Sequence, residues 1–400
     1  MYWDERPDTN NKAISEAMSR NRFIQIMKYL HVCDNNNLSN SRFAKVMPLW
    51  NLLNDKWLKC FPNEVNLCVD ESMIPYYGRH GGKQHMHNKP IRFGFKAWCL
   101  CTRLGYVVQS KLYEGSKTGI TNTNVGLGGS VVLDLIENLK GSSYSIYFDN
   151  FFTSVPLLET LKQKDIHGTG TIRANRTEKA PLTEVRSMAK RERGTCESVT
   201  DSASGVTLVR YMDNNVVTMA STKAGINPMS KVKRYSQALK KYVYVNQPAS
   251  VVMYNTYMGG VDRMDENVAK MRVNIRGKKW YWQLLSFLLN VSVNNAWQLY
   301  RWVEKSKPQQ LDLLNFTRTI SLAYLQKYSE RLAIGRPPRQ VLAVHKRVTL
   351  EVRFDGQNHV IVSNNKQSRC GQCKKNARMK CRKCNIALHT HCFEVFHNKA

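Results

Sequence analysis

The stretch VNLCVDE at residues 65–71 carries the clearest strand pattern in the chain. Its apolar residues Val65, Leu67 and Val69 recur at every second position, which is the period of a β-strand with one buried face. Asp70 and Glu71 follow directly. The pattern therefore predicts a strand that carries carboxylates at its tip.

The patterns that follow this stretch predict a mixed α/β layer. Residues 93–101 and 106–113 are expected to form a hairpin, 132–139 a helix ended by Gly141, 144–148 a strand, 155–161 a helix and 167–173 a strand. The second predicted strand ends on Asp149. The order strand, hairpin, helix, strand, helix, strand places a carboxylate at two strand ends.

Both flanks of this layer have helical periodicity. Apolar residues share one face in 23–30 and in 48–61, and the helical period returns over 259–271 and 280–302. Between them, residues 175–250 are rich in Lys, Arg, Ser and Thr, with a hairpin expected to turn at residues 213–215. This segment predicts an inserted β-rich subdomain.

Four aspartates are candidates for a metal site. Asp70 and Asp149 would meet if their strands are neighbours, while Asp262 and Asp265 lie three residues apart at the start of a helix, hence on one face. Clustered carboxylates repel unless a cation lies between them, and oxygen ligands suit Mg²⁺ or Mn²⁺. Two such ions roughly 3.5–4 Å apart support phosphodiester chemistry. The alternative is that these aspartates cap helices or accept hydrogen bonds from turn amides.

The end of the chain carries a run of metal-ligand residues. The run is Cys370-x2-Cys373-x7-Cys381-x2-Cys384-x4-His389-x-His391-Cys392-x4-His397. It supplies enough thiolate and imidazole for two tetrahedral Zn²⁺ ions, whose binding would fold a segment too short for a core of its own. A disulfide or free-thiol cluster and a RING-like or PHD-like protein-interaction module are the alternatives.

Charge points to a polyanionic partner. Sixty Lys and Arg against 30 Asp and Glu give a net charge of +30 over 400 residues, which favours nucleic acid over a merely basic soluble protein. Residues 366–400 contain nine Lys and Arg and one Glu. We therefore expect DNA contacts from Lys374, Lys375, Arg382 and Lys383.

Two further cationic segments have open interpretations. RGKKWYW at residues 276–282 would place Arg276, Lys278 and Lys279 against phosphates at a helix start, or would be a solvated helix end. KVKR at residues 231–234 would contact DNA or contribute to a nuclear import signal.

The cysteine content and the hydropathy indicate the kind of cellular compartment in which the protein is expected. Eleven cysteines, six of them without paired spacing, indicate reduced thiols and a reducing compartment. The sequence shows no signal-peptide pattern and no apolar run of about 18 residues, so no membrane association is expected.

Five motifs, in order along the chain, resemble the piggyBac transposase family. They are VDESMIPYYGR at 69–79, NKP at 88–90, FDNFFTS at 148–154, GTGTIRAN at 168–175 and GGVDRMD at 259–265. The resemblance covers nearly the whole chain, including the terminal cysteine run. It implies a ribonuclease-H-like catalytic core with acids at Asp70, Asp149 and Asp262, and Asp265 as an auxiliary acid.

The same resemblance implies function and partners. Family members cut transposon ends by metal-assisted hydrolysis, pass through a DNA hairpin and join the ends to TTAA targets, so we expect double-stranded DNA, a homodimer and the nucleus. The family's cross-braced zinc domain binds DNA. Its pairing would put Cys370, Cys373, His389 and Cys392 on one ion, and Cys381, Cys384, His391 and His397 on the other.

The resemblance also sets the expected domains. A helical dimerisation and DNA-binding region is expected in two parts, 1–64 and 266–348, the second of which includes a basic linker. The core is likewise expected in two parts, 65–174 and 251–265. The insertion is expected at 175–250 and the zinc domain at 366–400. Family members have a longer N-terminal region, so a truncated or alternative product is expected. Many cellular members are domesticated. We therefore keep two alternatives to the enzyme: a non-catalytic DNA-binding or chromatin factor, and a zinc-knuckle interaction module.

Overall fold

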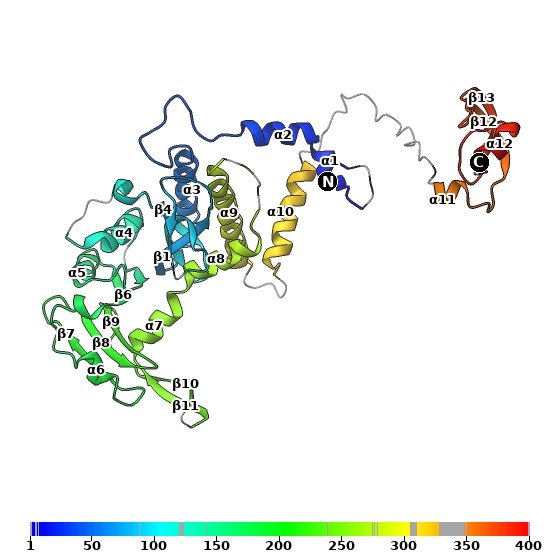
Figure 1. The fold of residues 1–400 in the computed structure, drawn as a ribbon. Helices are drawn as coiled ribbons and strands as arrows, with labels where there is room; N and C mark the ends of the chain where they lie inside the picture. Colours follow the sequence, from blue (N-terminus) through cyan, green and yellow to red (C-terminus); the bar gives the residue numbers. More distant parts are fainter. Residues whose placement is uncertain are drawn as a thin grey trace. The chain divides into compact units, whose positions relative to one another are not determined.

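The computed structural model describes residues 2–4, 6, 8–87, 89–119, 124–141, 143–237, 239–273, 275, 277, 279–304, 310–327, 348 and 350–398. The chain divides into two compact units, Met1–Tyr328 and Ser329–Ala400 (Figure 1). Each unit is described by itself.

The first unit is built on a mixed sheet. Its central strands are β1 (Asn66–Pro75), β3 (Phe93–Thr102), β4 (Val107–Leu112), β5 (Ser145–Phe148) and β6 (His167–Thr171). They lie in the order β4-β3-β1-β5-β6, with β3 antiparallel to its neighbours and β5 parallel to both β1 and β6. The predicted strands are confirmed, except that β1 does not end at Asp70. Beyond that residue it stays paired with β3, while its pairing with β5 stops at Val69.

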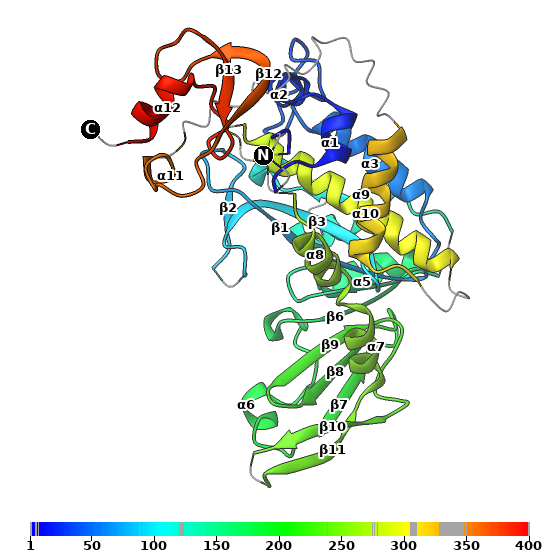
Figure 2. The same ribbon diagram turned by 90° about the vertical axis from the view of Figure 1, so that its right-hand side faces the viewer.

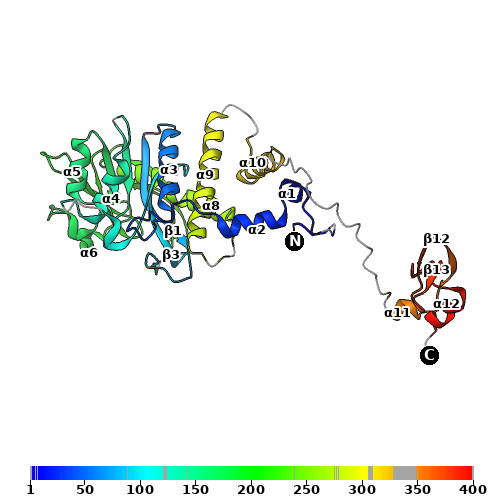
Figure 3. The ribbon, with the colours of Figure 1, turned by 90° about the horizontal axis from the view of Figure 1, so that it is seen from above.

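Helices cover both faces of this sheet. Helices α4 (Gly126–Ile136) and α5 (Val155–Gln163) lie on one side, and α3 (Met47–Lys59), α8 (Gly260–Lys270) and α9 (Tyr281–Val303) on the other (Figure 3). Successive residues of β1 point to opposite faces: Leu67 and Val69 join the core under α4 and α5, while Cys68 and Ile74 join the core under α8 and α9.

The predicted β-rich insertion contributes strands to two sheets. Strands β7 (Cys196–Thr200), β8 (Thr207–Met212) and β9 (Val216–Ser221) extend the central sheet, because β9 pairs antiparallel with β6. A separate two-stranded sheet consists of β10 (Ser230–Ser236) and β11 (Lys241–Gln247). Figure 2 shows both sheets, with α6 (Val185–Met188) beside them.

The remaining elements of the first unit are mostly helical. They are α1 (Lys12–Ala17), α2 (Arg20–Tyr29), α7 (Ala249–Tyr257) and α10 (Leu313–Lys327), the short strand β2 (Gln84–His85) and the 3-10 turns Gly115–Thr118 and Ala174–Arg176. Helix α2 was expected to bury an apolar face, yet Phe23 and Ile24 are 41% and 49% exposed. None of the described helices has the length and apolar character needed to cross a bilayer.

The second unit contains α11 (Leu350–Arg353), β12 (Ile361–Arg369), β13 (Asn376–Cys381) and α12 (Thr390–His397). It begins before the predicted boundary at residue 366, because β12 pairs with β13 from Ile361 onward. Among the described residues of this unit, four of the eight in the buried core are cysteines of the terminal run.

Candidate active site and metal centres

Two predicted acids lie next to each other on neighbouring strands. Val69 of β1 pairs with Phe148 of β5 in parallel register, so Asp70 and Asp149 each follow the last pair of the ladder. Cys68 and Tyr147, two residues earlier on each strand, belong to the core under α8 and α9. By the two-residue period, Asp70 and Asp149 also face that side.

Helix α8 brings the other two acids to the same face. Its first residue, Gly260, approaches the sheet so closely that a Cβ there would lie 2.2 Å from the Thr102 carbonyl oxygen and 2.7 Å from Cys68 Sγ. Farther along, Ser72 Oγ of β1 donates a hydrogen bond of 2.5 Å to Asp265 Oδ1. The exposed Asp262 lies one turn earlier on the same helix.

The local hydrogen bonds leave part of each carboxylate available. Asp70 Oδ1 accepts the Glu71 amide at 2.8 Å, and Asp149 Oδ1 accepts the Phe151 amide at 2.9 Å. The Phe152 amide also acts as a hydrogen-bond donor to the Asp149 carboxylate. The turn-amide interpretation is therefore true of both aspartates, and each carboxylate still has lone pairs that could bind a cation.

Burial makes these carboxylates hard to ionise in the absence of a cation. Burial first, and then the charge of Glu71, raises the pKa of Asp70 to about 7. Burial likewise raises the pKa of Asp265 to about 7 and raises the pKa of Asp149. A divalent cation would offset this penalty, since it favours the charged form of each group.

A lysine partly offsets the negative charge of this site. Lys89 Nζ lies 3.2 Å from Glu71 Oε1, and it is close enough to Asp70 and Asp262 to interact with their charges. Burial lowers the pKa of Lys89, but the surrounding carboxylates outweigh burial and raise it overall. Sequence reasoning placed Lys89 in a family motif and gave it no role; its proximity to the acids is evident only in the fold.

The acids do not converge tightly on their own. Among the described residues, the sets of three or more potential ligand atoms within 4.8 Å of one another are two Cys/His clusters. The carboxylates of Asp70, Asp149 and Asp262 form no such set. Their oxygen donors suit Mg²⁺ or Mn²⁺, and the cation would have to draw the groups together against their mutual repulsion.

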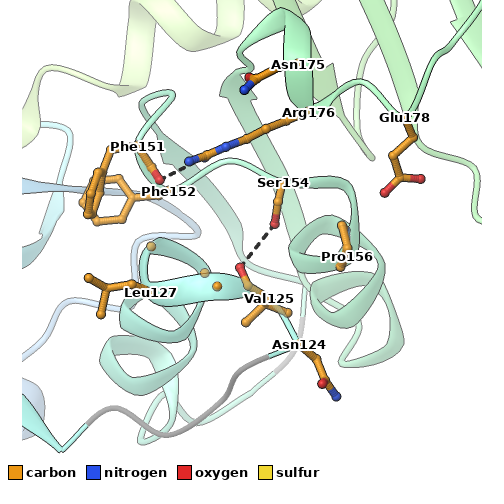
Figure 4. Close-up of a pocket in the computed structure, with 13 residues that line it drawn as sticks. Asn124, Val125, Leu127, Phe151, Phe152, Ser154, Pro156, Asn175, Arg176 and Glu178 are labelled. Atoms are coloured by element: carbon orange, nitrogen blue, oxygen red, sulfur yellow. Dashed lines mark hydrogen bonds between the residues drawn. The ribbon is translucent and has the colours of Figure 1, made fainter.

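The loop after Asp149 is fixed by an arginine beside a cavity. Arg176 Nη1 donates to the carbonyl oxygens of Asn150, Phe151 and Thr153 at 3.1, 3.2 and 3.1 Å. Figure 4 shows Arg176 reaching across toward Phe151 above the start of α4, where a cavity of about 370 Å³ opens. The arginine holds the turn that carries Asp149 in one conformation.

The first Cys/His cluster matches the predicted set Cys370, Cys373, His389 and Cys392. His389 Nδ1 lies 3.3 Å from Cys373 Sγ and 3.9 Å from Cys392 Sγ, while its Nε2 is 2.9 Å from the Asn376 carbonyl oxygen. A backbone carbonyl on the second nitrogen selects the tautomer in which Nδ1 is free to bind metal. These donors fit tetrahedral Zn²⁺.

The second cluster corrects the predicted ligand set. It consists of His359, Cys381, Cys384 and His397, whereas His391 is exposed and belongs to neither cluster. His359 Nδ1 lies 3.4 Å from Cys381 Sγ and 3.5 Å from Cys384 Sγ. The placement of His391 has a simple cause: it follows His389 by two residues at the start of α12, where the chain turns it outward.

The remaining nitrogens of this second cluster also fit a metal. His397 Nδ1 is 2.9 Å from the Arg353 carbonyl oxygen, while its Nε2 is buried without a hydrogen-bond partner among the described residues. His359 Nε2 lies 3.0 Å from Asp355 Oδ1, an arrangement that orients zinc-binding histidines. The sequence signal for His359 was weak, because it lies outside the cysteine run and before residue 366.

The predicted DNA-contacting cations have mixed placements. Arg276 and Lys278 lie outside the described residues. Lys279 Nζ donates to the Lys28 carbonyl oxygen at 2.6 Å. Lys374, Lys375, Arg382 and Lys383 are exposed, although Lys374 bonds the Gly371 carbonyl oxygen and Lys383 pairs with Asp355.

Comparison with known proteins assigns the chain to a family. Residues 1–297 match the family model described as Transposase IS4. The human PiggyBac transposable element-derived protein 3 is 42% identical over 405 residues, covering 100% of this chain and 66% of that protein. The human PiggyBac transposable element-derived protein 2 is 37% identical over 401 residues, covering 99% and 66% respectively. The chain thus spans just under two thirds of these relatives' length.

A solved structure has the same fold. The cryo-EM structure of a piggyBac transposase synaptic complex with hairpin DNA superposes with a TM-score of 0.66 and 22% identity, covering 96% of this chain and 82% of that one. The resemblance inferred from the motifs is confirmed: this chain belongs to the transposase family that includes the piggyBac transposable element-derived proteins.

Proposed function

We propose that the chain binds double-stranded DNA and cleaves and joins DNA strands at TTAA sites, using Asp70, Asp149 and Asp262. The observation that carries this proposal is the parallel register of β1 and β5, which sets Asp70 beside Asp149 on the face that α8 covers. Helix α8 then adds Asp262 and Asp265 to that face. When bound, Mg²⁺ or Mn²⁺ would activate the attacking oxygen and stabilise the leaving oxygen.

The strand order supports a ribonuclease-H-like core. An antiparallel β4-β3-β1 meander is followed by two parallel strands, β5 and β6, with α4 and α5 as the connecting helices. The residues of the chain would have distinct roles: Asp70 and Asp149 would hold the cation from the sheet and Asp262 would hold it from α8, while Arg176 fixes the Asp149 turn. Ser72 holds Asp265 as a positioning acid.

The second unit supports DNA recognition. Two clusters of four donors each fit one Zn²⁺, so we propose two zinc ions. The exposed Lys375 and Arg382, together with the excess of cations in residues 366–400, give this unit a surface suited to phosphates.

The proposal includes a nuclear homodimer. The relatives' names and the +30 charge favour a protein that works on chromosomal DNA. The apolar face of α2, with Phe23 and Ile24 exposed, is available to a second copy of the chain. Analytical ultracentrifugation of the full chain and of Phe23→Ser/Ile24→Ser tests the dimer.

A second candidate function is a DNA-binding factor that does not cut DNA. Two observations favour it: the human relatives are named as element-derived proteins, and the carboxylates stay apart in the structure. A protein-interaction role for the zinc unit is a variant of this candidate, and removal of residues 350–400 would test it through loss of a protein partner with DNA affinity unchanged.

A cleavage assay separates the two candidates. The purified chain is incubated with Mg²⁺ or Mn²⁺ and a duplex that carries a transposon end next to TTAA, beside a duplex with that tetranucleotide scrambled. We expect nicks and hairpins with the first duplex only. Asp149→Asn should lower the rate at least 1,000-fold, on the order of the loss of a principal catalytic group, with DNA affinity unchanged. Asp201→Asn, in an exposed turn, is the charge-matched control. DNA binding without any cleavage by the unaltered chain would favour the second candidate.

A further inference from the structure

The two-stranded sheet of β10 and β11 presents a face of cations and tyrosines. Its pairing sets Lys231 opposite Asn246, Lys233 opposite Tyr244 and Tyr235 opposite Tyr242. All six residues are exposed, and the three tyrosines are 45% (Tyr235), 63% (Tyr242) and 73% (Tyr244) exposed. Tyr242 and Tyr244 are more than half exposed, and together with Tyr235 they form an exposed aromatic surface on one short ribbon.

The opposite face anchors the ribbon to the first unit. Val245 is buried, Arg234 Nε donates to Asp213 Oδ2 at 3.3 Å, and Tyr211 Oη donates to the Asn246 carbonyl oxygen at 2.9 Å. These contacts fix the face to which each residue points. The cationic run at residues 231–234 is thereby split, with Arg234 neutralised inside and the two lysines directed outward.

The charge of this region has one sign. Residues 214–261 contain six Lys and Arg and no Asp or Glu. Lys233 Nζ lies 4.7 Å from the centroid of the Tyr242 ring, and within the described residues neither Lys231 nor Lys233 has an acidic partner. The outer face is therefore a cationic surface whose cations are free to meet an anion.

We infer that the outer face of the β10–β11 ribbon binds double-stranded DNA. An antiparallel β-ribbon fits the major groove of B-DNA, lysines neutralise phosphates as point charges, and Tyr and Asn donate hydrogen bonds to phosphates and base edges. Lys231 and Lys233, two residues apart on one strand, stand about 6.6 Å apart along it. A protein partner fits less well, since lysine is depleted in protein interfaces. The inference rests on the proposed DNA binding and adds a contact surface to it.

The test measures duplex affinity at several salt concentrations. The full chain, loaded with zinc, is titrated with a duplex of about 30 base pairs by fluorescence anisotropy. Lys231→Ala/Lys233→Ala should reduce the slope of log affinity against log salt by about two, one for each lost phosphate contact, equally for any sequence. The control Lys164→Ala/Lys190→Ala removes the same charge from exposed positions elsewhere and should leave the slope unchanged.

A tyrosine variant adds a second readout. Tyr242→Ala/Tyr244→Ala should weaken duplex binding while the salt slope stays the same, because no charge is lost. An unchanged slope in the lysine variant, or an equal fall in the control, would overturn the inference. So would a tyrosine variant that alters self-association and leaves DNA affinity intact, since the face would then be a protein interface. If the unaltered chain binds no duplex at all, the proposed function fails and the inference falls with it.

Discussion

Replacing His359 by alanine should remove one zinc ion from the second unit and leave the other in place. His359 contributes one of four donor atoms to the cluster with Cys381, Cys384 and His397. The sequence alone favoured His391 for this position, so the two histidines make a matched pair. His391→Ala, at an exposed residue outside both clusters, should retain both ions.

The size of the effect follows from the number of ligands. Binding of a structural Zn²⁺ supplies about 10–16 kcal/mol in small zinc domains. If the four donors contribute about equally, loss of one costs about 2.5–4 kcal/mol, which is roughly 60- to 800-fold in affinity because about 1.4 kcal/mol is tenfold. Asp355→Asn, which removes the carboxylate that orients His359, should weaken the same site only about 10- to 100-fold.

The assay is a chelator competition on the full chain. Zinc content is first measured by atomic emission after gel filtration, and release is then followed with a chromophoric chelator. We expect two ions per unaltered chain, and one tightly held ion with one readily removed in His359→Ala. Ready release of one ion from His391→Ala, with His359→Ala unchanged, would refute the reasoning from geometry and restore the assignment made from the sequence.

Two further predictions concern the first unit. Burial raises the pKa of Asp265 from its ordinary value of 3.8 to about 7, so the fold favours the protonated acid. The resulting stabilisation is complete below pH about 4 and is lost as the pH rises to about 7, by at most about 4 kcal/mol. Without Mg²⁺ or Mn²⁺, the free energy of unfolding measured with denaturant should fall between about pH 4 and about pH 7, and Asp265→Asn, which keeps the acceptor for Ser72, should make that fall shallower. An equally steep fall in the variant would contradict the assignment. Gly260→Ala should lower the free energy of unfolding by about 1–3 kcal/mol because its Cβ would meet the Thr102 carbonyl. Gly259→Ala, whose Cβ would have no atom within 4 Å, should leave the free energy of unfolding unchanged. Equal losses in the two variants would show that α8 does not pack against Thr102 as described.

Local periodicity predicted the elements of the core well. The alternation in residues 65–69 and 144–148 located two strands, and the acids that follow them lie side by side as expected. What local patterns lack is information on pairing. The extension of β1 to Pro75 depends on its partner β3, and the addition of β9 to β6 depends on a chain reversal about 50 residues long. Neither contact leaves a trace in the periodicity of one segment.

The candidate metal centres also depend on strand pairing that local sequence patterns do not predict. The spacing of the cysteines predicted two metal sites, because C-x2-C brings two thiolates to one ion through a single tight turn. The division of the ligands between the two sites came from the family resemblance. The fourth ligand of the second cluster, His359, comes from the segment just before β12, and the pairing of β12 with β13 brings it close to Cys381. The family's pairing favoured His391, which lies inside the cysteine run, whereas the fold brings His359 close in space. The cationic segment at residues 231–234 shows the same limit, since only the pairing of β10 with β11 reveals that Lys231 and Lys233 face outward while Arg234 contacts Asp213. Residue type thus identifies which side chains could bind a metal or a phosphate, and strand register decides which of them lie together or face outward.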